Sequence, residues 1–404
     1  MRISKESIGL IAIATFCFLG VNLYLDVFAY TYELNDVGDS LSYKEAAQML
    51  FYEGKAHPTR PIGIAFFFGL IEGIHPILIT VVHFFLWIAT ILILNKSFLL
   101  LTNKKRSFVL SLIFVVCVSN ILFINLEITE TLTAFLLTII SFQILKYALS
   151  KGTKHLLFAS ALLVLLVLIK PGFYYASITM ALFAIWKSIN GKTPIKVYAP
   201  LIISFAFLIL NNSMVYKSYG KFKPSFIDDV TLYTYLSAYS QTEVRNTSTA
   251  RIQRERREKM KSLTYAEIHD LAWKDIRFQI EYHPFVVFRY WAINTQNNAS
   301  GGTVLIHGLN KIKNTIGKHQ ILYRLSQFQN ILMVVLSLLF PIFHLLKYRK
   351  VDTFLVVTSI LIWYIIFTSG ISYFQGDRFH IGFYPMVLMQ VAYFLFKKKA
   401  INIA

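Results

Sequence analysis

Cysteine and charge are both scarce in this chain of 404 residues, and each scarcity excludes a class of protein. The two cysteines, Cys17 and Cys117, lie inside apolar runs, so they cannot form a disulfide framework, and no Cys/His spacing of a metal site exists. We expect both to pack as small hydrophobic side chains. Only 15% of the residues are charged, against roughly a quarter in soluble proteins, which excludes an ordinary soluble domain.

Acidic residues are scarcer than basic ones, with 21 Asp and Glu against 40 Lys and Arg and a net charge of +19. In a soluble protein this excess would suggest a nucleic-acid partner. Here 56% of the residues are hydrophobic and the mean hydropathy is +0.55. Cytoplasmic loops of membrane proteins collect Lys and Arg, which explains the excess better. We therefore expect membrane lipid, and no nucleic acid, as a partner.

Membrane-length apolar runs fill most of the sequence. A helix needs about 20 apolar residues to cross the hydrocarbon core. The first run is too long for the apolar part of a typical signal peptide, so we expect a retained helix. These runs predict an all-α integral membrane protein with about 10 transmembrane helices, at residues 8–29, 74–94, 107–124, 130–147, 155–170, 172–187, 197–212, 327–346, 352–370 and 381–396.

The polar stretches between the runs divide the chain into three parts. We predict an N-terminal transmembrane module (1–212) with a first outer loop (30–73), an extracytoplasmic helical region (213–326) and C-terminal transmembrane helices (327–404). Within the first outer loop, residues 62–73 are apolar and are followed by His75-Pro76, which favours a helix lying at the membrane interface. Further along, Lys170-Pro171-Gly172 predicts either a tight turn or a kink.

Positive charge is divided unevenly between the two ends of the predicted helices. Most Lys and Arg residues cluster at one set of ends, and the short loops on the other side hold only Lys44, Lys55, Arg60, Lys170 and Arg378. By the positive-inside rule the clustered ends face the cytoplasm, and an even number of crossings puts both termini there. We predict a multi-pass protein of the bacterial inner (plasma) membrane whose site faces the periplasm or exterior.

An acidic segment, residues 36–40, lies just past the first predicted helix. One interpretation is structural: Asp39 or Ser42 caps a helix over residues 41–53, and Ser42 forms a capping box with Glu45. This interpretation does not exclude chemistry, because a carboxylate at the membrane face can also point at a substrate.

In chain order the first outer loop reads Asp39-Ser40-x-x-Tyr43, Ala46-x-x-x-Leu50, Gly54 and Arg60-Pro61, directly before an apolar helix. This pattern resembles the first periplasmic loop of the GT-C class of glycosyltransferases, which includes the protein O-mannosyltransferases and the lipid A aminoarabinose transferases. Enzymes of that class span the membrane many times, take a sugar from a polyprenyl-phosphate carrier and have an acidic residue in this loop. The class often has an Asp-Glu pair here, whereas this chain has Ser40 after Asp39.

Four later segments resemble the same class in the same order. They are the acidic turn with Glu127 and Glu130, the pair Lys170-Pro171, the pair His283-Pro284, and the segment 375–385 with Arg378. In the last segment His380 stands where the class has a second Arg. Each segment also has a simpler interpretation, because acids favour helix N-termini and basic side chains reach for lipid phosphates.

The resemblance implies a GT-C type glycosyltransferase that moves a sugar, with inversion, from a polyprenyl-phosphate sugar donor to a glycan, lipid or protein acceptor. Asp39 would be the general base for the acceptor hydroxyl. Lys170 and Arg378 would hold the donor phosphate. A divalent metal near Asp39, helped by Glu127 or Glu130, is left open. The full set of expected substrate-binding residues is Lys170, Arg378, Tyr43, Arg60, Glu127 and Glu130.

Two other functions share this composition. A lipid-linked sugar flippase or transporter would show paired repeats and broken helices at the membrane midplane, and the sequence shows neither. An O-antigen polymerase would rely on Arg and His of the large outer loop, not on an acid in the first. The basic run 245–261 predicts a solvated helix laced with Glu255 and Glu258, or a docking site for anionic lipid or glycan. A cavity shared by Asp39, Lys170 and Arg378 would favour the glycosyltransferase.

Overall fold

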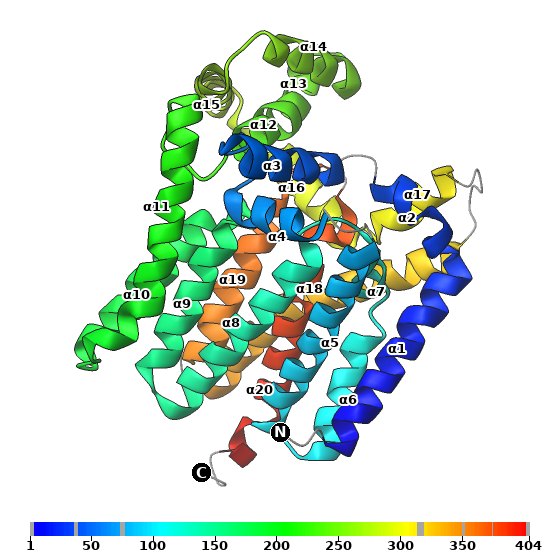
Figure 1. The fold of residues 1–404 in the computed structure, drawn as a ribbon, viewed down its shortest axis with the longest axis vertical. Helices are drawn as coiled ribbons and strands as arrows, with labels where there is room; N and C mark the ends of the chain where they lie inside the picture. Colours follow the sequence, from blue (N-terminus) through cyan, green and yellow to red (C-terminus); the bar gives the residue numbers. More distant parts are fainter. Residues whose placement is uncertain are drawn as a thin grey trace.

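The computed structural model describes residues 4–35, 39–72, 77–312, 319–349, 352–373 and 375–400. Every regular element in these residues is helical (Figure 1), which confirms the predicted all-α class. Residues 36–38 of the acidic segment and 73–76, which include His75-Pro76, lie outside the described residues.

Apolar helices form a bundle, and further helices gather over one end of it (Figure 1). The bundle consists of α1 (Lys5–Leu25), α5 (Ile77–Leu99), α6 (Lys104–Val115), α7 (Val118–Leu122), α8 (Glu130–Ser150), α9 (Thr153–Val167), α10 (Tyr174–Asn190), α11 (Ala199–Tyr219), α18 (Gln320–Tyr348), α19 (Thr353–Ser369) and α20 (Tyr384–Ala400). The helices over that end are α2 (Thr31–Asn35), α3 (Asp39–Glu53), α4 (Ile62–Glu72), α12 (Ile227–Thr231), α13 (Ser237–Arg245), α14 (Thr249–Lys261), α15 (Tyr265–Tyr282), α16 (Pro284–Ser300) and α17 (Val304–Ile312).

Five helices of the described chain are long and apolar enough to cross a membrane: α1, α5, α8, the segment Ile195–Tyr219 that ends in α11, and α18. The pair α6 and α7, bent by 66°, makes a sixth if it is one span. The structure thus supports a membrane-spanning protein but does not confirm about 10 crossings. At three predicted crossings, 155–170, 352–370 and 381–396, the apolar helix is shorter than a full span. The run 381–396 begins with the 3₁₀ turn η7 (Ile381–Phe383), which apolar composition alone cannot separate from α-helix.

The buried core of the bundle follows α8 and α9. Helix α8 packs against α5 and α9, and α9 also packs against α10 and α11. Side chains such as Leu137, Leu163 and Leu166 are fully buried there, whereas Phe16 and Leu182 are exposed on the outside of the bundle. Large apolar side chains on the outer face are what contact with lipid requires.

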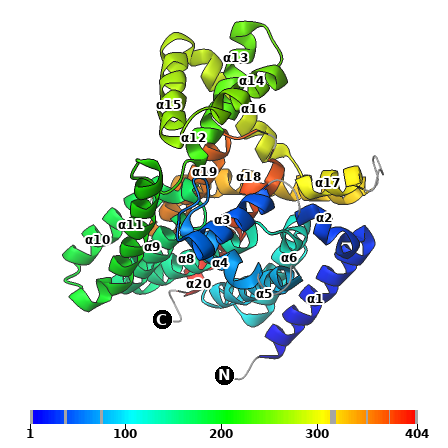
Figure 2. The same cartoon turned by 45° about the horizontal axis from the view of Figure 1, so that its top comes forward.

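The predicted region 213–326 contains α12 to α17, but bundle helices enter it at both ends, because α11 runs to Tyr219 and α18 begins at Gln320. Helices α12 to α16 (227–300) form a layer over one end of the bundle, and we call this layer the helical cap (Figure 2). The start of α1 and the end of α20 lie at the other end of the bundle (Figure 1). Most of the basic run forms α14, where Glu255 pairs with Arg251 of the same helix and with Arg245 at the end of α13. This pairing favours a solvated helix.

Candidate active site

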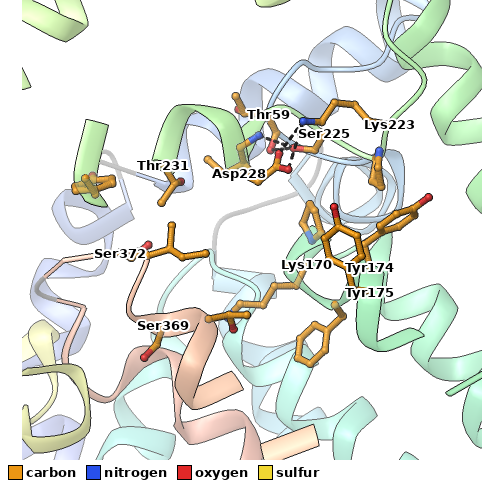
Figure 3. Close-up of a pocket in the computed structure, with 18 of the residues that line it drawn as sticks. Thr59, Lys170, Tyr174, Tyr175, Lys223, Ser225, Asp228, Thr231, Ser369 and Ser372 are labelled. Atoms are coloured by element: carbon orange, nitrogen blue, oxygen red, sulfur yellow. Dashed lines mark hydrogen bonds and ion pairs between the residues drawn. The ribbon is translucent and has the colours of Figure 1, made fainter. Parts of the chain in front are cut away.

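A large cavity of about 1220 Å³ lies where the helical cap meets the bundle. Its lining comes from the start of α3, the loop before α4, the start of α8, the turn after α9, the end of α19, and helices α12 and α15. Figure 3 shows two of its walls, with Lys223 and Asp228 on one and Lys170 and Ser369 on the other. A cavity of this size can hold a sugar head group beside a second substrate.

Asp39 is the first residue of α3 and lies between two guanidinium groups. Its Oδ1 accepts a hydrogen bond from Arg60 at 2.5 Å, and its Oδ2 pairs with Arg378 at 2.5 Å. Ser42 lies inside the first turn, where its hydroxyl donates to the Asp39 carbonyl and accepts from Nε of Arg60. The predicted capping box of Ser42 with Glu45 was therefore wrong, because the helix begins earlier than residue 41.

The two arginines control the ionisation of Asp39. Burial raises the pKa of the carboxyl, but Arg378 and Arg60 outweigh burial and hold the pKa below its ordinary value. The side chain remains 34% exposed, so it can be reached from the cavity. Asp39 is thus ionised at neutral pH, and it is a weaker base than a free aspartate while both arginines bind it.

Arg378 also connects Asp39 to a second carboxylate. Its Nε donates to Oε1 of Glu130 at 2.6 Å, and Nζ of Lys170 contacts the same oxygen at 3.4 Å. Glu130 is only 1% exposed and opens α8, where the helix dipole favours a negative charge. Lys170 lies over the ring of Phe379 at 5.1 Å. Segments far apart in the sequence thus meet in one network of ion pairs.

We call Asp39, Arg60, Glu130, Lys170 and Arg378 the charge cluster. Burial lowers the pKa of Lys170, and Glu130 offsets part of that effect. Burial also opposes the charge on Arg378, but Glu130 and Asp39 outweigh it and raise the pKa of the guanidinium. Three cations against two carboxylates leave the cluster with one net positive charge. The cavity therefore attracts an anion.

Tyr43 and Glu127, the other two residues expected at the site, differ in their placement. The guanidinium of Arg60 lies 4.4 Å from the ring centre of Tyr43, a cation–π contact on the cavity lining. Glu127 is buried outside that lining and pairs with Lys44 at 3.3 Å. The structure thus brings Tyr43 together with the charge cluster and leaves Glu127 apart.

The chain around Lys170 and Arg378 explains how these two cations reach the cavity. Helix α9 ends at Val167, and the 3₁₀ turn η3 (Pro171–Phe173) leads into α10, so Lys170 lies in a turn and not in a kinked helix. Arg378 lies in another 3₁₀ turn, η6 (Gly376–Phe379). His380, two residues on, is fully buried and bonds to Asn330 at 3.0 Å, away from the cavity.

One wall of the cavity was missed by the sequence reasoning. Helix α15 contributes His269, Trp273, Arg277 and Glu281 to the lining. These residues recur at every fourth position, which puts them on one face of a helix. This spacing of aromatic and charged side chains could have indicated a binding wall. The same spacing is also found on an ordinary solvated helix face, so it does not single out a site.

The carboxylates at the site do not fit the divalent metal that the resemblance left open. Asp39 and Glu130 are each already bound by a guanidinium, and Glu127 lies elsewhere. Within the described residues, no group of three or more His, Cys, Asp or Glu side chains could hold a metal ion. The net charge of the cluster is already positive, so it suits an anion better than a cation.

No protein-family model, curated protein or solved structure matches this chain.

Proposed function

We propose that this protein is a membrane glycosyltransferase that moves a sugar from a polyprenyl-phosphate carrier to a hydroxyl acceptor at the outer face of a bacterial inner membrane. The observation that carries the proposal is the charge cluster in a cavity between an apolar bundle and a helical cap. A lipid-borne phosphate can approach from the bundle side, while the acceptor enters beside the cap.

The charge of the cluster matches the donor. A polyprenyl-phosphate sugar is a phosphodiester with one negative charge, which balances the single net positive charge of the cluster. Arg378 offers a planar fork of donors and Lys170 a compact point charge. When the sugar leaves, the phosphate gains a second negative charge. Cations already fixed in a cavity stabilise that charge without rearrangement.

Asp39 is the base in this proposal, and the donor prepares it. The donor phosphate competes with Asp39 for Arg378, so donor binding removes one cation from the carboxylate and raises its pKa. The acceptor oxygen then attacks the anomeric carbon from the face opposite the phosphate, and its proton passes to Asp39. The bond between that carbon and the phosphate oxygen breaks, and its electron pair stays on the phosphate. One displacement inverts the anomeric centre.

A flippase for lipid-linked sugars is the second candidate, because the bent pair α6–α7 is a broken helix of the kind that lines transporter sites. No residue of α6 or α7 lines the cavity, however, and the charge cluster comes from other elements. The location of the polar groups favours the transferase.

The test of the function is a turnover assay with the purified full-length protein in detergent. A panel of polyprenyl-phosphate sugars is supplied with glycan, lipid and peptide acceptors, and released polyprenyl phosphate is measured by mass spectrometry. We expect release that falls about 10²–10⁴-fold in Asp39→Asn, the usual effect of losing a general base. A flippase would instead move the donor across vesicle membranes without releasing polyprenyl phosphate, and that outcome would reject the proposal.

A further inference from the structure

A second polar cluster lines the cavity on the side of the helical cap. Its centre is Asp229 of α12, which is only 1% exposed. Nδ1 of His269 lies 2.9 Å from its Oδ1, Nε1 of Trp273 donates to the same oxygen at 3.1 Å, and Nζ of Lys223 binds Oδ2. None of these residues belongs to the charge cluster. A buried carboxylate thus fixes three side chains that line the cavity.

These contacts determine the tautomer of His269. The oxygens of Asp229 accept from the ammonium of Lys223 and from the indole N–H of Trp273, and a carboxylate that binds two such donors serves as an acceptor toward His269 as well. Nδ1 of His269 lies 2.9 Å from the carboxylate and 3.4 Å from Nζ of Lys223, so Nδ1 donates to Asp229. In the tautomer with one ring proton, Nε2 is then an acceptor on the side of the ring away from Asp229. Nε2 has no partner among the described residues, and His269 lines the cavity. The cluster therefore offers a hydrogen-bond acceptor to a hydroxyl group.

Trp273 adds an aromatic surface next to this acceptor. Its indole is held by Asp229 and is still 37% exposed on the cavity lining. Arg277 and Glu281 continue the same face of α15, so the wall from His269 to Glu281 extends about 18 Å at the helical rise of 1.5 Å per residue. The wall thus combines the aromatic face of Trp273 with polar groups that can bind hydroxyls.

The charges on this wall do not select a strongly charged ligand. Asp270 and Glu281 balance Lys274 and Arg277, and all four line the cavity. A sugar ring has an apolar C–H face that packs on an aromatic ring and a rim of hydroxyls that need hydrogen bonds. Helix α15 stands in the cap at the end of α11, where Tyr265 packs on Tyr219, and its cavity-lining residues lie beyond that end of the bundle (Figure 1). This position disfavours the tail of a lipid acceptor.

We infer that α12 and α15 form the acceptor site and that the acceptor is a saccharide, with Trp273 as the stacking surface and His269 as a hydroxyl-binding group. As an acceptor site the inference rests on the proposed function, but saccharide binding is measured separately from transfer. Asp229 is a positioning residue that holds both rings toward the cavity.

Binding is tested first, with the full-length protein in detergent and soluble oligosaccharides of glucose, mannose, galactose and N-acetylglucosamine, by calorimetry. We expect Trp273→Ala to weaken binding about tenfold, the scale of one lost aromatic contact, and Trp273→Phe to weaken it less. Trp186→Ala is the matched control, because this exposed tryptophan lies 11 residues after the cavity-lining Tyr175 on α10, about 16 Å along the helix. Unchanged affinity for polyprenyl phosphate in every variant shows that the protein is folded.

The outcomes separate this inference from the proposed function. If oligosaccharides bind through Trp273 but no donor is turned over, the saccharide site stands and glycosyl transfer falls. If transfer occurs only to peptide or lipid acceptors, or if Trp273→Ala binds oligosaccharides as well as wild type, the inference is overturned and the transferase remains. Failure of every oligosaccharide to bind also overturns it. Transfer to a saccharide with an acceptor KM raised in Trp273→Ala and His269→Gln supports both.

Discussion

At the residue scale, the two oxygens of Asp39 are held by different arginines, so the basicity of this carboxyl depends on what else those arginines bind. Arg60 has a second partner in Ser42, and Arg378 has a second partner in Glu130. Arg378 is the one expected to face the donor phosphate. The proposed reaction therefore couples donor binding to the activation of the base.

This coupling predicts a shift between two pH profiles. A base must be deprotonated, so activity falls as the pH drops through the pKa of Asp39. In the free protein Arg378 and Arg60 hold that pKa below its ordinary value, and the bound donor removes the effect of Arg378. The acid limb of kcat, which reports the complex, should lie at higher pH than the acid limb of kcat/KM, which reports the free enzyme. Coincident limbs would show that the donor leaves the pair of Asp39 and Arg378 intact.

Removal of either phosphate-binding cation should weaken the donor and spare the acceptor. We expect Lys170→Ala and Arg378→Ala to lower the affinity for polyprenyl phosphate by about 2–5 kcal/mol, because a charged partner is left unpaired in a water-poor cavity. Equilibrium binding of labelled polyprenyl phosphate measures this. Lys146→Ala is the matched control, since this lysine lies on α8 about 24 Å along the helix from Glu130. Equal donor affinity in all three variants would remove both residues from the phosphate site.

Lys170 and Arg378 could be identified from the sequence, because cations are rare in short outer loops. The ion-pair partners of these cations could not be predicted from the sequence, because Arg378 and Glu130 are separated by 248 positions. Glu127 and Glu130 look equivalent in the sequence, yet the bend before α8 turns one toward Lys44 and the other toward the cavity. Side-chain direction at a bend depends on packing, which composition and spacing do not contain.

At the element scale, the turn that carries Lys170 is positioned by a close approach between α4 and the end of α9. The backbone N–H of Ile64 donates to the carbonyl of Leu168 at 3.0 Å. A Cβ on Gly63 would lie 2.7 Å from the Cβ of Leu168 and 2.8 Å from its carbonyl oxygen. The two helices therefore meet through backbone atoms, two residues before Lys170.

This contact predicts that Gly63→Ala is destabilising. The added methyl group forces the end of α9 to move, at a cost of about 1–3 kcal/mol for overpacking, and it displaces Lys170 as well. Thermal unfolding in detergent should show a lower midpoint, and donor affinity should fall with it. Gly172→Ala is the control, because a Cβ there meets no atom within 4 Å. A Gly63→Ala protein as stable as the control would mean that α4 does not fix the turn.

The helices themselves were largely predictable, because apolar runs long enough to span lipid also form helices. Helices α1, α5, α8 and α18 fall at predicted crossings with modest shifts of their ends. Helix α9 ends three residues before the predicted crossing 155–170 does, and α20 begins three residues after the start of 381–396, because η7 is as apolar as the helix that follows it. The close contact at Gly63 could not be foreseen, since it depends on how two helices pack.

At the scale of the whole molecule, the cavity lies at one end of the bundle, and both termini of the described chain lie at the other (Figure 1). The same end of the bundle thus holds the start of α1 and the end of α20. Together with the distribution of Lys and Arg, this predicts that both termini are cytoplasmic and the cavity is outside. A reporter that works only in the cytoplasm should be active when fused after Ala404 and inactive when inserted at Thr247 in the cap. The reverse pattern would invert the topology.

The most direct test of the account is a structure of the full-length protein with a bound polyprenyl-phosphate sugar, determined in a lipid nanodisc. The account predicts the phosphate within hydrogen-bonding distance of Arg378 and Lys170, with the ion pair between Arg378 and Asp39 opened and the sugar directed toward α15. A phosphate bound elsewhere, for instance against the basic helix α14, with the charge cluster unchanged, would contradict it.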